Sequence, residues 1–161
     1  MNAAVELYNK ELQHRLDKLC GAIDGLDVEL LNWRPTIPEA NSVSAISTHV
    51  LGNVRAWVLG VCCGQPVERD RAAEFKVEGL EAGELIERTK VVGREAEEAL
   101  MALDASTLDE LREVPDRLTS QRSREPVTGR EAAVHAIAHA AEHLGHIEIT
   151  RDLARTAVGP T

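Results

Sequence analysis

The chain has 161 residues, a formal net charge of −9 and a pI near 5.1. Its composition is 43% hydrophobic but only 2% aromatic, which favours closely packed helices over a sandwich or barrel, so the expected fold class is all-α. The acidic balance argues against a nucleic-acid partner, because binding phosphates requires a clustered positive surface. No apolar run approaches the roughly 20 residues that span a bilayer, and the N-terminal residues lack the pattern of a signal peptide. A cytoplasmic protein without a membrane partner is therefore expected.

Apolar side chains at spacings of three and four mark the first two predicted helices. The first carries such a stripe over residues 5–23 and is expected to end near Gly25. Two prolines in the segment LNWRPTIPEANS (31–42) then interrupt the pattern, and Asn41 or Ser42 can cap the second helix. That helix has an apolar stripe over residues 43–61 and, beside it, a strip of small residues around His49. Small side chains leave room for a pocket or for a close approach of another helix.

Two further helices follow in the second half of the chain. A stripe over residues 85–103 predicts the third, after a long charged connection at 64–80. Thr107 and Glu110 could then form a capping box for one or two turns, and residues 115–127 read as a loop. A second capping box, Thr128 with Glu131, predicts the start of the last helix, which should run to about Arg155.

Four long helices without a strand pattern predict a four-helix bundle that forms one domain over residues 1–161. The connections after the second and third helices are each about 20 residues, which is long for neighbouring antiparallel helices. At least one of them is therefore expected to cross over an end of the bundle.

The last helix contains the segment HAIAHAAEHLGH (135–146), which holds four of the six histidines. Relative to His135, a helical wheel places His146 at about 20°, His139 at about 40° and His143 at about 80°, so all four share one arc beside the apolar face. Imidazoles at i and i+4 can both reach one metal ion at about 2.0 to 2.1 Å. Two ligands do not make a stable site, and His49 on the second helix is the natural third.

The alternative is that these histidines are ordinary core or surface residues with hydrogen-bond partners. Several imidazoles placed beside an apolar face cost free energy unless a common partner, such as a metal ion, satisfies their nitrogens. This favours metal binding by His49, His139 and His143. His135 and His146 are expected at the rim, because a tetrahedral ion cannot use the whole stripe. The Glu-x-x-His motif that ends at His14 occurs once and faces away from the apolar stripe, so a di-iron site is not expected.

The sequence resembles the DinB-like family of metal-binding four-helix bundles, and the resemblance covers nearly the whole chain. The segments that carry it are LNWRP (31–35), NSVSAISTHVLGNVRAW (41–57), RDRAAEF (69–75) and HAAEHLGHI (139–147).

The resemblance implies that one histidine of the second helix and an i,i+4 pair of the last helix bind a divalent ion. These positions are His49, His139 and His143 here. The pattern departs from the family at Glu142, where relatives often have a histidine, and at His146, where they often have a glutamine. Neither change removes an implied ligand. Both side chains are candidates for carrying a proton or for supporting a ligand.

Three neutral imidazoles would leave a divalent ion its full charge and at least one open position. The resemblance implies a thiol S-transferase, in which a low-molecular-weight thiol attacks a small-molecule electrophile; a thiol-dependent isomerase also belongs among such relatives. A metal-dependent small hydrolase and a non-enzymatic metal-binding or stress-response bundle remain open alternatives. Zinc is the first expectation for the metal, with nickel, iron and manganese as alternatives. No catalytic side chain is assigned, and a homodimer formed through a helix face is a further expectation.

Overall fold

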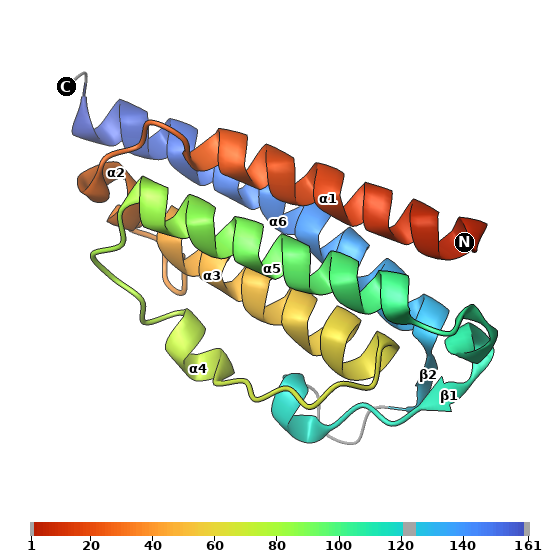
Figure 1. The fold of residues 1–161 in the computed structure, drawn as a ribbon. Coiled ribbons are helices and arrows are strands. Elements are labelled where there is room, and N and C mark those ends of the chain that lie inside the picture. Colours follow the sequence, from red (N-terminus) through yellow and green to blue (C-terminus); the bar gives the residue numbers. More distant parts are fainter. Residues whose placement is uncertain (1, 121–124, 160–161) are drawn as a thin grey trace.

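The computed structural model describes residues 2–120 and 125–159, and helices make up most of it (Figure 1). The long elements are α1 (Ala3–Ile23), α3 (Val43–Val54), α5 (Ala82–Ala102) and α6 (Gly129–Val158). A π-helical segment, Arg55–Cys62, continues α3 without a break. The prediction of an all-α helical bundle is confirmed. Helix α6 extends to Val158, three residues beyond its expected end at Arg155.

Short elements occupy the connections between the long helices. They are α2 (Val28–Asn32), α4 (Arg71–Glu74), the 3-10 helices Ala105–Asp109 and Asp116–Leu118, and the strands β1 (Leu111–Arg112) and β2 (Val127–Thr128). The strands are antiparallel, with Leu111 opposite Thr128. Two-residue strands are too short to show an alternating pattern in the sequence, so they could not be predicted.

Capping residues were predicted at three helix starts, and each can be compared with the observed cap. Ser42 caps α3 by accepting a hydrogen bond from the backbone N–H of Ala45. The capping box of Thr128 and Glu131 at the start of α6 is confirmed. The box predicted at Thr107 is wrong, because the 3-10 helix begins earlier, where the carboxylate of Asp104 accepts from the backbone N–H of Ser106.

The direction of the helices explains the first long connection. In Figure 1, α1 and α6 run one way along the bundle while α3 and α5 run the other way. Because α3 and α5 are parallel, residues 63–81 must return along the length of the molecule before α5 begins, and α4 lies on this return path. At least one of the two long connections was expected to cross over an end of the bundle; this one follows the side of the bundle, beside α3.

The core lies between the four long helices. Helix α1 packs against α5 and α6, and α3 packs against α6. Each helix contributes fully buried side chains, for example Leu12 from α1, Val50 from α3, Leu85 from α5 and Ile147 from α6. This packing sets the middle of α3, where His49 lies, against the histidine-rich part of α6.

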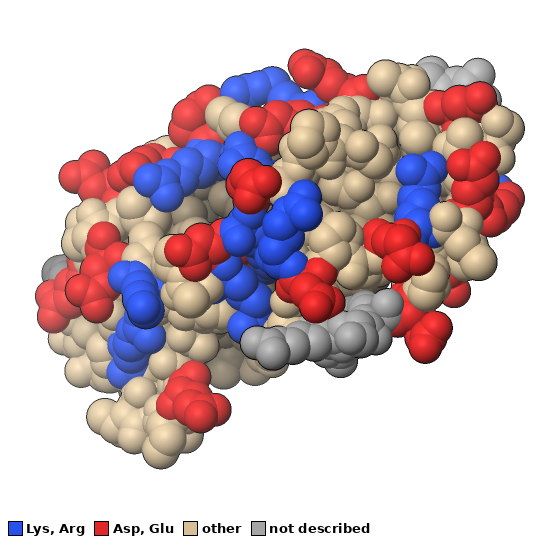
Figure 2. Space-filling view, turned by 90° about the horizontal axis from the view of Figure 1, so that it is seen from below, with Lys and Arg blue, Asp and Glu red and all other residues tan. Residues whose placement is uncertain are grey.

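Charged side chains are spread over the face that carries the returning connection. Figure 2 shows one group of Lys and Arg near the middle of this face and others towards its edges, with Asp and Glu distributed among them. On α5, Arg88 pairs with Glu84 at 2.7 Å, and both side chains are about half exposed (48% and 49%). Such exposed pairs contribute little to stability. Among the described residues, no helix is both long and apolar enough to cross a membrane.

Candidate metal centre

The structure brings together the three histidines that the sequence analysis selected. His49 comes from the buried side of α3, and His139 and His143 come from successive turns of α6. One ring nitrogen from each lies within 4.8 Å of the others. The ring centroids are 4.9 Å apart for His49 and His139, and 4.3 Å apart for His139 and His143. Two helices that are distant in the sequence thus form one cluster of imidazoles.

The hydrogen bonding of this cluster fits a cation. Nε2 of His49 and Nε2 of His139 are 3.1 Å apart, so two nitrogens share this space and only one proton can lie between them. Nδ1 of His139 is buried and has no hydrogen-bond partner within the described part of the chain. Buried polar atoms without partners are rare because they lose hydration without replacement. Three imidazoles whose ring nitrogens converge in this way are a donor set that zinc and related divalent ions take.

Electrostatics keep two of the imidazoles neutral. Burial, together with the nearby His143, His49 and His135, lowers the pKa of His139 to about 3. Burial also lowers the pKa of His143 to about 4, with additional contributions from His49 and His146. A neutral imidazole offers the lone pair that a metal ion requires, so protons compete poorly for this site.

These shifts predict how the stability of the metal-free protein depends on pH. Between about pH 6.5 and 4 the unfolded chain takes up protons on His139 and His143 while the folded chain does not, so the free energy of unfolding should fall as the pH falls. Urea denaturation in the presence of a chelator measures this slope. The double variant His139→Gln/His143→Gln should have a shallower slope, and an unchanged slope would contradict the shifts.

Two charged residues that the sequence pattern did not single out contact Nδ1 of His49. Glu74 is buried, and its Oε2 is 2.7 Å from Nδ1 of His49. Arg69 donates to both carboxylate oxygens of Glu74, at 2.6 and 2.9 Å. Burial alone would raise the pKa of Glu74, but the hydrogen bonds from His49 and Arg69 hold it below its usual value. The carboxylate is therefore ionised at neutral pH.

Their position explains why sequence reasoning missed them. Both lie in the stretch 64–80, which reads as a charged, solvated connection. The usable signal was Asp70 followed by Arg-Ala-Ala-Glu-Phe, because Asp70 caps α4 by accepting from the backbone N–H of Ala73. A cap followed by one helical turn indicates that this segment is ordered, and Glu74 is at the end of that turn.

The other histidines of the stripe lie outside the cluster of three. His135 stacks on Trp57, with ring centroids 3.9 Å apart, and its centroid is 6.0 Å from that of His139. His146 is exposed, and its Nδ1 is 3.2 Å from Nδ1 of His143. Glu142 is also exposed. His135 and His146 thus flank the cluster on either side along α6, consistent with the rim position expected for them.

A family model described as mycothiol-S-transferase matches residues 8–156. The chain belongs to this family. The DinB-like resemblance is confirmed as well, because the fold is similar to the crystal structure of a DinB-like protein from Bacillus cereus, with a TM-score of 0.73. The two chains are 15% identical, and the similarity covers 92% of this chain and 91% of the other. No match was found among curated proteins.

In this member of the mycothiol-S-transferase family, two hollows lie on either side of Arg69. The smaller, of about 230 Å³, is lined by His49, His139 and His135 together with Trp57. The larger, of about 690 Å³, is lined by Arg69 and Glu74 but by none of the histidines. Size alone would favour the larger hollow, but His49 and His139 of the candidate site line the smaller one. We therefore place the candidate site there.

Proposed function

We propose that this member of the mycothiol-S-transferase family is a divalent-metal-dependent enzyme that transfers a low-molecular-weight thiol, through its sulfur atom, to a small electrophile. The observation that carries the proposal is the cluster of His49, His139 and His143, three imidazoles with ring nitrogens within 4.8 Å. The family match supports the thiol as one reactant. We propose zinc as the metal, because three histidines are a frequent ligand set of catalytic zinc, with nickel, iron and manganese as alternatives.

The three imidazoles affect the reaction in two ways: they leave the charge of the ion unneutralised, and they leave room for another ligand. A divalent ion held by three neutral imidazoles retains its full charge and lowers the pKa of a thiol that it binds. Within the described chain no fourth histidine, cysteine or carboxylate joins the cluster, which leaves a position for an external ligand. The small pocket beside His49 and His139 gives that ligand access.

The proposed reaction is a nucleophilic substitution. The thiol loses its proton, its sulfur forms a bond to an electrophilic carbon, and the leaving group departs with its electron pair. The chain's contribution is to hold the imidazoles neutral and to exclude bulk water with the buried side chains around His49. His146 is exposed next to His143, and we assign it the role of passing the proton to solvent.

Thiol transfer to a chromogenic aryl halide tests this function. The zinc-loaded protein should form the coloured aryl thioether of mycothiol faster than the uncatalysed reaction does, and His143→Ala should lose this activity. Glutathione, cysteine and coenzyme A serve as comparison thiols. His14→Ala is the matched control, because His14 is an exposed residue of α1 outside the histidine cluster.

Two results would contradict the proposal. Hydrolysis of an ester substrate without any thiol requirement would show that water is the nucleophile. Stoichiometric metal without activity toward any thiol would indicate a metal-binding protein that is not a transferase.

A further inference from the structure

The contact between His49 and Glu74 determines which nitrogen of His49 faces the cluster. Nδ1 lies 2.7 Å from Glu74 Oε2 and 3.3 Å from Arg69 Nη2. A bare Nδ1 would point its lone pair at an ionised carboxylate at the shorter of these distances, which is repulsive. Nδ1 therefore carries the proton and donates it to Glu74, and Nε2 is left with a free lone pair toward His139.

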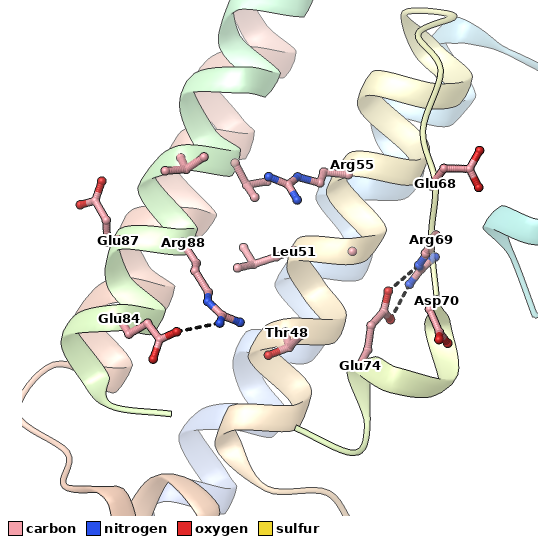
Figure 3. Close-up of a pocket in the computed structure, with 13 residues that line it drawn as sticks. Thr48, Leu51, Arg55, Glu68, Arg69, Asp70, Glu74, Glu84, Glu87 and Arg88 are labelled. Carbon is pink, nitrogen blue, oxygen red and sulfur yellow. Dashed lines mark hydrogen bonds and ion pairs between the residues drawn. The ribbon is translucent and has the colours of Figure 1, made fainter. Parts of the chain in front are cut away.

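Arg69 holds Glu74 in this position. Its side chain is only 4% exposed, and it forms a two-pronged ion pair with the carboxylate (Figure 3). Its third contact is a hydrogen bond from Nη1 to the backbone carbonyl of Leu118 at 2.7 Å. Arg69, on the returning connection, thus links the carboxylate to the end of the second 3-10 helix. This bidentate geometry fixes the orientation of the carboxylate as well as its position.

Gly52 of α3 provides the space for the pair. It lies one turn after His49, and a methyl group at this position would overlap Oε1 and Cδ of Glu74 and crowd Nε of Arg69. A glycine within a helix carries a cost in stability relative to alanine. Here that cost is explained, because no larger residue leaves room for the carboxylate beside His49.

We infer that Glu74 is the residue that positions His49 for metal binding, with Arg69 and Gly52 as the two features that hold it in place. The inference rests on the proposed metal site. A carboxylate that accepts from the second nitrogen of a histidine ligand fixes its tautomer and its orientation, and removing such a partner typically weakens metal affinity about 10- to 100-fold. None of the three side chains needs to contact the ion.

The first test measures zinc affinity by competition with a chromogenic chelator, in wild type and Glu74→Gln. The variant should bind zinc about 10- to 100-fold more weakly. The absorption spectrum of the cobalt-loaded protein should also change, because the imidazole of His49 is no longer held at one angle. If wild type binds zinc and Glu74→Gln matches its affinity and its cobalt spectrum, this inference fails while the proposed function stands. If wild type binds no divalent ion, the proposed function fails with it.

A double variant separates positioning from a general loss of stability. Glu74→Gln alone leaves the buried Arg69 without its ionic partner, which destabilises the fold. Glu74→Gln/Arg69→Met removes both charges and should recover much of the melting temperature of the metal-free protein, yet its zinc affinity should stay low. Recovery of wild-type affinity together with the melting temperature would show that the pair is merely structural.

Gly52→Ala tests the same inference without altering a polar group. The added methyl group should displace Glu74 and weaken zinc binding. Gly21→Ala is the matched control, because Gly21 is also within a helix and a methyl group there meets no atom within 4 Å. Zinc affinity should be unchanged in the control. Wild-type affinity in Gly52→Ala would contradict the packing on which the inference depends.

Discussion

His49→Ala is expected to purify without stoichiometric divalent metal. His49 is the one member of the cluster that α3 supplies, so its loss leaves the i,i+4 pair of α6, His139 and His143, as the remaining ligands. Two imidazoles cannot complete a tetrahedral site. The effect should exceed the approximately 10- to 100-fold loss that follows removal of a supporting residue. Metal content by mass spectrometry after dialysis against a weak chelator measures it.

His143→Ala should lose metal to a similar extent, whereas His14→Ala should keep it. The His146→Ala variant discriminates more finely, because His146 lies beside His143 but outside the cluster of three. It should retain stoichiometric metal. Full metal content in both His49→Ala and His143→Ala would show that the ion is bound elsewhere.

Ile147→Ala is expected to produce a large loss of stability. Ile147 is fully buried, at 0% exposure, and its helix, α6, carries both His139 and His143. Replacing a buried isoleucine by alanine removes apolar contacts and leaves a cavity, which typically lowers the free energy of unfolding by about 2 to 5 kcal/mol. Urea denaturation of the metal-free protein measures this change.

Ile149→Ala provides the control on the same helix. Ile149 is 62% exposed, so the same truncation should change the free energy of unfolding by less than about 0.5 kcal/mol. Equal effects of the two variants would contradict the orientation of α6, and with it the direction in which His139 and His143 point.

The long helices could be predicted because their apolar faces repeat along the sequence. Burial of Val5, Leu12 and Leu16 on one side of α1 follows the three- and four-residue spacing directly. The same regularity identified the start of α6, where Thr128 and Glu131 form a local capping box that depends on no distant residue. Patterns that arise within one helix are thus readable from the chain alone.

The returning connection could not be predicted in this way, because its order depends on tertiary contacts. Glu74 is buried only because Arg69 neutralises it and because Gly52, on another element, makes room. The sequence of residues 64–80 alone shows their charges but not these tertiary contacts. The π-helical segment Arg55–Cys62 gave no signal either, since it continues the apolar stripe of α3.

Part of the candidate site could be predicted, because two of its three residues lie on one helix. His139 and His143 share a helix, so their proximity follows from helical geometry. The addition of His49 required the packing of α3 against α6, which the small residues around His49 suggested and the structure shows. Metal ligation by the three residues stays a prediction.

X-ray absorption spectroscopy of the zinc-loaded protein tests the central claim most directly. The account predicts one zinc per chain with the scattering of three imidazoles, at zinc–nitrogen distances of about 2.0 to 2.1 Å. The same spectrum for His49→Ala should show either no bound zinc or fewer imidazoles. A wild-type spectrum with two imidazoles or fewer, or one dominated by protein sulfur at about 2.3 Å, would contradict it.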